Sequence, residues 1–458
     1  MPFDTFTNKR VTIMGLGLHG GGTEAARWFV GQGARVTVTD LRTSKQLQPS
    51  LRELKGLPIS YNIGRHLPAD FVHADLIIKN PGVPHTSPFL RLAHQLHIPV
   101  ETDLSVFIKK VRNPIVGITG TKGKSTTTSL IYSILKKGNR KPLMAGNIRI
   151  SPLKILSKIK RNTPVILELS SWQLEDLGHI SWSPHISVLT NIMPDHLNRY
   201  RSMKAYIRAK SLIFKFQNRK DFLIANYDDR TVRIITRNIQ SKIVWYSAAN
   251  NPRCQVYIAN GIIYYKKTRI IRIYDITFPG VVNIGNILAA IAVSITLGVP
   301  IIYIKKALIA FTGVYGRMEL VRKIGKLSFI NDTTATTPDA SISALSAFKG
   351  TVVLIAGGSD KKLNYAGLAK SIKESVVRVY MLPGSASEKI LIQLKKLGYK
   401  DIFFAQSMKQ AVRQAFAYAN TNTVGTILLS PGAASFGLFL NEFDRGDQFT
   451  SQVNKLTA

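Results

Sequence analysis

Short apolar runs alternate with helix-like stretches over the first hundred residues of the chain. The clearest runs are 11–14, 35–40 and 76–79. Strands that alternate with helices build βαβ units, in which neighbouring strands are parallel. Residues 1–103 are therefore predicted to form a Rossmann-like α/β domain.

The same alternation continues beyond residue 104. Apolar runs at 115–119, 165–169 and 186–189 predict further parallel strands. Asn260-Gly261 stands between two β-rich runs, 256–259 and 262–265. Because asparagine and glycine accept the positive φ of a tight turn, an antiparallel hairpin is predicted there. The middle of the chain is thus expected to carry a mainly parallel sheet with an antiparallel piece.

A third series of apolar runs begins after residue 314. It comprises 352–356, 377–382, 402–404 and 426–430, with helical patterns between the runs. The chain is therefore predicted to be an α/β protein of three tandem domains, with boundaries at 1–103, 104–313 and 314–458.

The most apolar stretch runs from Ile287 to Ile304. It is interrupted by Gly298-Val299-Pro300, and glycine followed by proline is typical of a helix end. We expect a buried helix followed by a connector, and no membrane insertion.

Composition narrows the class of protein further. The 458 residues are 45% hydrophobic, which is enough for several buried cores. Cys254 is the single cysteine, so an internal disulfide and a cysteine metal cluster are excluded. This count fits a reducing compartment, and we expect a cytoplasmic monomer.

The net charge is +36, which raises the question of nucleic-acid binding. Lysine pairs such as Lys109-Lys110, Lys266-Lys267 and Lys361-Lys362 are spread along the chain, and no tract concentrates them. This distribution favours a solvated basic surface that attracts anionic substrates. Specific nucleic-acid binding is not predicted, although a nucleic-acid-binding ATPase stays as an alternative.

Two glycine-rich turns carry candidate chemistry. Gly15-Leu16-Gly17-Leu18-His19-Gly20 follows a strand and opens a helix, and Asp40 ends the next strand. This arrangement lets backbone N–H groups approach a pyrophosphate. A nicotinamide or flavin dinucleotide fits it, as in an NAD-dependent oxidoreductase, and so does a UDP-sugar.

The second turn, Gly120-Thr121-Lys122-Gly123-Lys124-Ser125-Thr126, follows the strand at 115–119. Its backbone can cradle phosphates, its lysine can neutralise their charge, and its serine can bind Mg²⁺. Ile118 stands where the strict pattern has glycine, so the loop is a variant. It predicts ATP binding and makes the central domain P-loop ATPase-like.

Polar residues follow two apolar strands of the same domain. Glu168 ends one strand and suits Mg²⁺, while His196 follows another and is a candidate metal ligand. Lys210 lies in a helical pattern that by itself is typical of a solvated lysine.

Together these segments resemble the Mur ligase family. The resemblance is carried by the loop 120–126, Glu168-Leu169-Ser170-Ser171, Asn191 through His196, and Asn283-Ile284-Gly285-Asn286, and it spans Gly15 to Gly446. The segments 331–336, 357–361 and 429–436 are similar to members that add D-glutamate. The resemblance implies an ATP-dependent amide-forming ligase in peptidoglycan synthesis, acting on UDP-N-acetylmuramoyl-L-alanine, D-glutamate and ATP through an acyl phosphate.

The resemblance also implies residue roles. Lys124, Glu168, His196 and Lys210 would be catalytic, and Ser125, Glu168, His196 and Lys210, the last as a carbamate, would hold Mg²⁺. ATP would be bound by Gly120, Thr121, Lys122, Gly123, Lys124, Ser125, Thr126, Asn283, Asn286, Arg317 and Asp332. The UDP-sugar would be bound by Gly17, Leu18, His19, Leu41, Arg42, Asn80, Gly82 and Asn147. D-Glutamate would be bound by Thr336, Lys361 and Ser435.

Some positions depart from the family pattern. Thr334 replaces a lysine, and the aromatic residue near Asn441-Glu442-Phe443 is shifted by one position. His19 and Val282 also differ from common family residues. These departures concern details of the pockets, and a related ligase for another amino acid remains the closest alternative.

Overall fold

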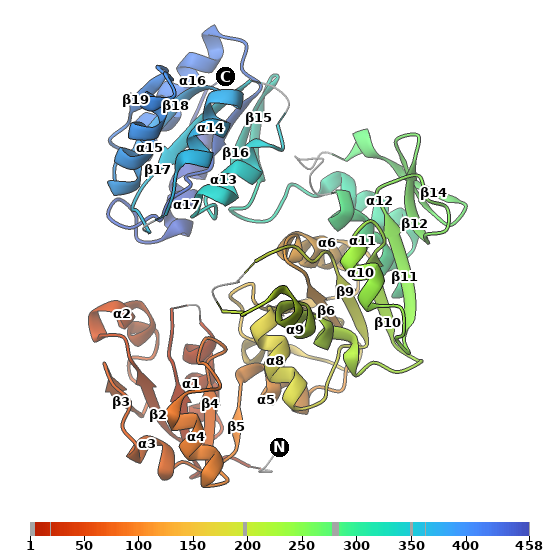
Figure 1. Ribbon diagram of the computed structural model, residues 1–458, viewed down its shortest axis with the longest axis vertical. Helices are drawn as coiled ribbons and strands as arrows, with labels where there is room; N and C mark the ends of the chain where they lie inside the picture. Colours follow the sequence, from red (N-terminus) through yellow and green to blue (C-terminus); the bar gives the residue numbers. More distant parts are fainter. Residues whose placement is uncertain are drawn as a thin grey trace. The chain divides into compact units, whose positions relative to one another are not determined.

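The computed structural model describes residues 5–18, 20–195, 199–276, 284–348, 351–361 and 363–457. The chain divides into two compact units, one of residues 1–273 with 285–307 and one of 274–284 with 308–458. Across the described residues the strands form sheets of five, nine and six strands (Figure 1). The three-domain α/β architecture expected from the sequence is confirmed, and the first two sheets belong to the first unit. The expected boundaries after residues 103 and 313 stay predictions.

The first sheet is parallel and has the order β3-β2-β1-β4-β5. Its strands are β1 Arg10–Met14, β2 Arg35–Asp40, β3 Ile59–Ile63, β4 Leu76–Lys79 and β5 Val100–Glu101. The helices are α1 Gly21–Gly31, α2 Ser44–Glu53, α3 Ala69–Val72, α4 Pro88–Gln95 and α5 Asp103–Lys110. Side chains of β1 alternate between two cores: Ile13 packs with α1 and α5, and Met14 packs with α3 and α4. The sheet is thus covered on both faces, as a parallel sheet requires.

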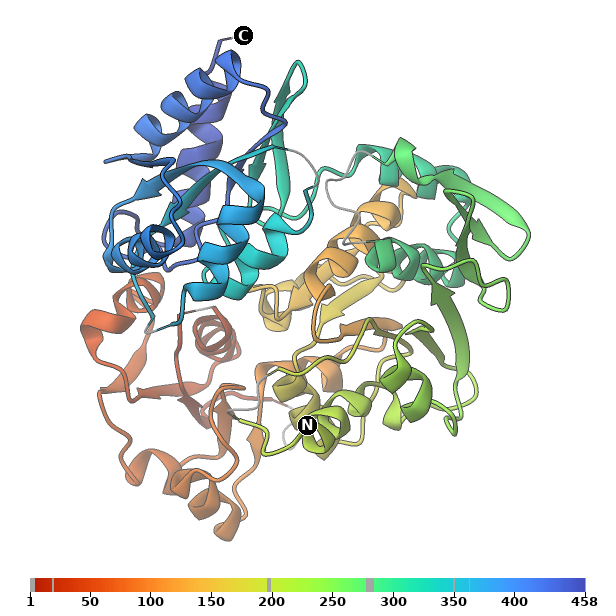
Figure 2. The same cartoon turned by 45° about the horizontal axis from the view of Figure 1, so that its top comes forward.

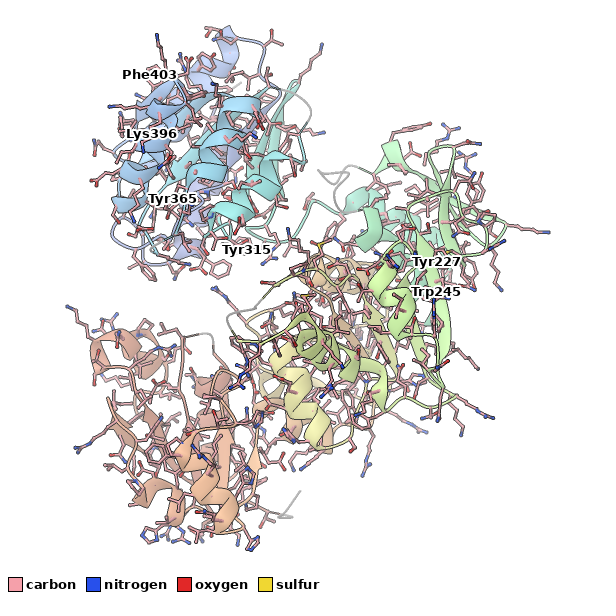
Figure 3. The ribbon with its side chains drawn as sticks, viewed as in Figure 1. Tyr227, Trp245, Tyr315, Tyr365, Lys396 and Phe403 are labelled. Atoms are coloured by element: carbon pink, nitrogen blue, oxygen red, sulfur yellow. The ribbon has the colours of Figure 1, made fainter. Side chains whose placement is uncertain are left out.

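The central sheet has the order β14-β13-β12-β11-β10-β9-β6-β8-β7. Its strands are β6 Ile115–Thr119, β7 Leu143–Gly146, β8 Val165–Glu168, β9 Ile186–Leu189, β10 Phe222–Asn226, β11 Lys242–Ser247, β12 Val256–Ala259, β13 Ile262–Tyr265 and β14 Thr268–Arg272. Pairing is parallel from β7 to β12 and antiparallel from β12 to β14. The predicted hairpin is confirmed, with φ of 48° at Asn260 and 70° at Gly261. Trp245 of β11 meets Tyr227 edge to face, with ring centroids 5.4 Å apart (Figure 3).

Helical segments stand between and after the strands of this sheet along the chain. They are α6 Lys124–Lys137, α7 Pro152–Ile155, η1 Leu156–Lys158, α8 Ser171–His179, α9 Met203–Lys215, α10 Arg230–Ile235, η2 Ile273–Asp275, α11 Ile284–Thr296 and α12 Ile301–Ala310. The apolar stretch from Ile287 lies in buried α11, and a turn with φ of 72° at Gly298 separates it from α12, as expected. No helix in the described part of the chain is long and apolar enough to cross a membrane.

The sheet of the second unit has the order β15-β16-β20-β17-β18-β19. The strands are β15 Glu319–Ile324, β16 Leu327–Asn331, β17 Val352–Gly357, β18 Val376–Leu382, β19 Ile402–Phe404 and β20 Thr426–Leu429. The helices are α13 Pro338–Leu345, α14 Ala366–Ser375, α15 Ser385–Lys396, α16 Met408–Thr421 and α17 Glu442–Asn454. One core joins α13, α14 and α15 to one face, and a second joins α16 and α17 to the other (Figure 1 and Figure 2). Only β15 runs antiparallel to its neighbour among the described strands of this sheet.

Candidate active site

The phosphate loop connects β6 to α6 and requires glycine at two positions. Gly120 has φ of 152° and Gly123 has φ of 87°. A Cβ at Gly120 would lie 1.9 Å from Thr190 Oγ1, and one at Gly123 would lie 2.1 Å from Asn286 Oδ1. The loop is therefore packed tightly against neighbouring segments, with its N–H groups at the N-terminus of a 14-residue helix.

Two side chains that follow β9 form hydrogen bonds with the backbone of this loop. Thr190 Oγ1 donates to Lys122 O at 2.7 Å, and Lys122 N donates to Asn191 Oδ1 at 2.9 Å. Thr121 Oγ1 lies 3.2 Å from the hydroxyl of Tyr206. The sequence signal for Thr190 and Asn191 was their place after an apolar strand, but neither was predicted as a site residue.

Two lysines lie against the same loop. Lys124 Nζ donates to Gly120 O and to Thr121 O, both at 2.9 Å. Lys210 Nζ of α9 donates to Gly120 O at 2.9 Å, and its side chain is 2% exposed. The pKa of Lys210 is lowered to about 7, mainly by burial and also by the Lys124 charge, while Asp195 opposes the shift. Lys210, which the sequence pattern alone favoured as a solvated residue, is thus buried at the phosphate loop.

The Glu168 carboxylate at the end of β8 is the adjacent acidic group. It is 1% exposed, and β8 pairs with β6 so that Glu168 is opposite Ile118. Asn147 Nδ2 donates to Glu168 Oε1 at 2.9 Å, while Oε2 is buried and has no hydrogen-bond partner among the described residues. A buried carboxylate oxygen without a hydrogen-bond partner is a suitable ligand for a cation such as Mg²⁺. Asn147, which is predicted to bind the UDP-sugar, thus lies beside this carboxylate.

Of the other residues predicted to bind ATP or metal in this domain, one lies at the phosphate loop and two lie outside the described residues. Asn286 of α11 accepts from Thr127 Oγ1 at 3.3 Å and lies against Gly123 of the phosphate loop. His196 and Asn283 lie outside the described residues. In the described part of the chain, no three histidine, cysteine or acidic side chains gather as a metal cluster. A metal site built from Glu168, Ser125 and a modified Lys210 would differ from such a cluster, because serine and lysine are neither histidine, cysteine nor acidic residues.

The glycine turn of the first domain is organised by Asp40. Gly17 N and Arg42 N donate to the Asp40 carboxylate at 3.1 and 2.9 Å. A Cβ at Gly15 would lie 3.0 Å from Asn80 Cβ, so the loop after β4 touches the turn. Leu18 and Leu41 are exposed beside it, at 46% and 66%.

Most of the residues predicted to bind the UDP-sugar thus border one turn, and His19 lies outside the described residues. Those at the turn are Gly17, Leu18, Leu41, Arg42, Asn80 and Gly82.

The remaining predicted residues lie in the second unit. Lys361 Nζ donates to Thr336 Oγ1 at 3.1 Å, and the buried Ser435 follows Ala434, whose backbone pairs with Ser359. The three segments predicted to bind D-glutamate therefore come together after the carboxyl ends of strands β16, β17 and β20.

Asp332 and Arg317 occupy the start of this unit. Asp332 accepts from Ser430 Oγ at 2.8 Å and from Met318 N at 3.2 Å. Burial raises its pKa to about 7, although these hydrogen bonds and the Arg317 charge oppose the shift. Tyr315, labelled in Figure 3, stacks on Phe443 with ring centroids 5.8 Å apart, and Arg317 is exposed.

Arg445 of α17 was not predicted and is fully buried. It donates to Thr333 O at 2.8 Å, to Thr333 Oγ1 at 3.1 Å and to Ala433 O at 3.1 Å. It therefore ties together the two segments that carry Thr336 and Ser435.

Comparison with known proteins adds to this geometry. Residues 9–102 match the model of the Mur ligase MurD-like N-terminal domain, 118–294 the Mur ligase middle domain, and 316–432 the Mur ligase glutamate ligase domain. A relative from Roseiflexus sp. is 39% identical over 98% of this chain and 99% of its own length. One from Geobacillus sp. is 36% identical over 98% of each chain. Both relatives are called UDP-N-acetylmuramoylalanine--D-glutamate ligase.

Solved structures share the fold at lower identity. The UDP-N-acetylmuramate-alanine ligase of Thermotoga maritima has a TM-score of 0.62 and 21% identity, with 98% of this chain and 99% of that chain covered. The MurF protein of Acinetobacter baumannii has a TM-score of 0.61 and 16% identity, with 97% and 93% covered.

Proposed function

The chain belongs to the Mur ligase family, and from that membership we propose that it joins D-glutamate to UDP-N-acetylmuramoyl-L-alanine in peptidoglycan synthesis. The bond formed is an amide between the L-alanine carboxylate and the amine of D-glutamate, and ATP drives the reaction. The observation that carries this assignment is the full-length match, at 33–39% identity, to relatives called UDP-N-acetylmuramoylalanine--D-glutamate ligase.

We assign the ATP phosphates to the loop 120–126. The N–H groups at the start of α6 suit an anion, and Lys124 already lies over the loop. Asn286 supports the assignment, since it contacts Gly123 and Thr127. Asn283, Arg317 and Asp332 complete the proposed ATP set by family resemblance.

We propose that Ser125, Glu168, His196 and a carbamate on Lys210 hold Mg²⁺. The buried, unpartnered Oε2 of Glu168 supports this set. When bound, the metal would supply positive charge to the phosphate oxygens. The lowered pKa of Lys210 supports carbamate formation, because only a neutral amine reacts with CO₂. The reaction replaces a buried cation with an anionic oxygen ligand.

The substrate assignments follow the two glycine- and hydroxyl-rich regions. We place UDP-N-acetylmuramoyl-L-alanine at the turn of the first domain, where Gly17, Arg42 and Asn80 border Asp40 and the exposed leucines. We place D-glutamate at Thr336, Lys361 and Ser435, because a lysine with hydroxyl groups suits a dicarboxylate.

The chemistry then follows in two steps. The L-alanine carboxylate attacks the γ-phosphorus of ATP, which gives an acyl phosphate and ADP. Lys124 offsets charge on the transferred phosphoryl group. The D-glutamate amine attacks the acyl carbon, the tetrahedral intermediate expels phosphate, and the amine loses a proton. We place the enzyme in the cytoplasm, because its single cysteine, Cys254, fits a reducing compartment, and we propose that it acts as a monomer.

The deciding experiment measures phosphate release from ATP with Mg²⁺ and UDP-N-acetylmuramoyl-L-alanine across a panel of amino acids. Release with D-glutamate, and not with L-glutamate, L-alanine or diamino acids, is expected. Release with a different amino acid would retain the ligase and reject the D-glutamate assignment. Absence of release with every amino acid would reject the proposed reaction.

A further inference from the structure

A buried ion pair crosses from the first domain to the central domain within the first unit. Lys79 Nζ lies 2.7 Å from Asp176 Oδ1, and each side chain is 4% exposed. Lys79 ends β4, and Asp176 lies in α8. Burying two charges is costly even when they are paired, and apolar side chains at such a junction are often as stable. The pair therefore calls for a role beyond stability.

Lys79 immediately precedes the loop that contacts the glycine turn. Asn80 N donates to Met14 O at 2.9 Å, and Gly82 N donates to Asn80 Oδ1 at 3.0 Å. Asn80 also lies so close to Gly15 that a Cβ there would be 3.0 Å from Asn80 Cβ. A displacement of Lys79 would therefore be passed to the loop and the turn.

Asp176 is connected in the same way to the carboxylate of the central domain. Helix α8 begins two residues after Leu169, with Ser170 and Gln173 forming a capping box at its start. Glu168 precedes this cap at the end of β8. The ion pair thus joins the turn of the first domain to the strand and helix that hold Glu168.

The loop after β4 contributes a second contact to Asp176. His85 Nε2 lies 3.0 Å from Asp176 Oδ1, and the rings of His85 and His179 are 4.8 Å apart. Asp176 Oδ2 has no hydrogen-bond partner among the described residues. Lys79 and His85, which both approach Asp176, thus belong to residues 79–85, which favours a role in holding that segment.

We propose that Asp176 is a positioning residue for the sugar nucleotide: through Lys79 and His85 it holds the loop 80–85 of the first domain against helix α8. This inference rests on the proposed function, since it takes the loop as part of the sugar-nucleotide site. The ATP loop is held separately by Thr190 and Asn191. Loss of the ion pair should consequently weaken the binding of one substrate and leave the other.

The test compares Asp176→Asn with the wild-type enzyme. We expect KM for UDP-N-acetylmuramoyl-L-alanine to rise about 10-fold or more, as when one partner of a buried charge pair is removed. KM for ATP and kcat at saturation should stay within about 2-fold of wild type. Calorimetric Kd values for the sugar nucleotide and for a non-hydrolysable ATP analogue provide a readout independent of turnover.

Lys109→Met is the matched control. Lys109 pairs with Glu101 inside the β5–α5 segment and does not belong to the loop 80–85. It should leave both KM values unchanged. Equal increases in both KM values for Asp176→Asn, with a lower Tm, would reduce Asp176 to a structural residue and overturn the proposal.

A second variant keeps the test decisive where a single substitution unfolds the chain. Lys79→Met combined with Asp176→Leu replaces the pair with apolar side chains, and the double variant should fold. Its KM for the sugar nucleotide should rise less than the product of the two single changes, because the two residues act on one contact. Independent effects would overturn the proposal.

The outcomes for the sugar nucleotide separate the two hypotheses. Wild-type affinity in Asp176→Asn would overturn the positioning role alone. Failure of the wild-type enzyme to bind UDP-N-acetylmuramoyl-L-alanine would overturn the proposed function, and the positioning role with it.

Discussion

Carbamate formation at Lys210 can be predicted quantitatively from its burial. At about pH 7.5 a lysine with a pKa of about 7 is roughly three-quarters neutral, whereas one with a pKa of 10.5 is about 0.1% neutral. The fold therefore raises the fraction of reactive amine by roughly two to three orders of magnitude. Lys210 should react with CO₂ at neutral pH, and surface lysines should remain protonated and unmodified.

The sign of the pH dependence follows from the same shift. As pH falls through about 7, Lys210 gains a proton and the neutral amine disappears. The carbamate signal should decline over that range. An unburied lysine would lose its neutral form near pH 10 instead.

The assay is ¹³C NMR of the protein equilibrated with labelled bicarbonate. Wild type should show a carbamate resonance that Lys210→Ala abolishes. Lys215→Ala is the matched control, because Lys215 lies in the same helix and is exposed. A resonance that survives in Lys210→Ala, or vanishes in Lys215→Ala, would refute the reasoning.

Turnover provides a second measurement of the same prediction. Lys210→Ala should be nearly inactive, and a high concentration of a short-chain carboxylate should restore part of the rate by supplying the missing oxygen ligand. Full activity of Lys210→Ala without added carboxylate would exclude the carbamate from the reaction.

Three further predictions concern the phosphate loop and the second unit. Lys124→Ala should lower kcat by about 10²-fold or more through loss of charge on the transferred phosphoryl group, and near-wild-type turnover would reject the ATP assignment. Gly123→Ala should weaken ATP binding, measured by calorimetry, because its Cβ would lie 2.1 Å from Asn286 Oδ1, and unchanged affinity would contradict the packing. Asp332 has a raised pKa of about 7, so its protonated form stabilises the fold at low pH, and that stability is lost between about pH 4 and pH 7. Asp332→Asn should flatten Tm against pH over that range, and an unchanged profile would show that another group titrates there.

Much of the fold could be predicted because its strands are continuous apolar runs. Strands β6, β8, β17 and β20 are buried along their whole length, which is what parallel strands covered on both faces require. Strand β15 was missed, since its positions are mostly half-buried and its sequence ELVRKI has no clear period. Its antiparallel pairing depends on the turn at Gly325, with φ of 56°, and not on apolar pattern.

The candidate site could be predicted from the sequence where it is formed by the backbone of a single short segment. The loop 120–126 contains two glycines whose added Cβ atoms would clash, and the turn 15–20 contains three glycines with positive φ. Contacts between distant segments left no such local signal. Asp176 meets Lys79 across 97 positions of sequence, and Arg445 meets Thr333 across 112.

Helical position nevertheless contained information about these charged residues. Lys210 is one turn from Tyr206 and from Ile213, both buried, and Arg445 is one turn from buried Phe449. Each charge therefore interrupts the apolar stripe that faces the core. A charge at such a position loses hydration, so it persists only where partners or chemistry compensate.

The two buried charges, Arg445 and Lys210, differ in their surroundings. Arg445 makes three hydrogen bonds to backbone and hydroxyl oxygens, and its guanidinium stays charged even though burial lowers its pKa to about 10. Burial lowers the pKa of Lys210 toward neutrality, and the charge of the nearby Lys124 adds to this lowering. A buried arginine is thereby suited to hold segments together, and a buried lysine beside another cation is suited to give up its proton and react.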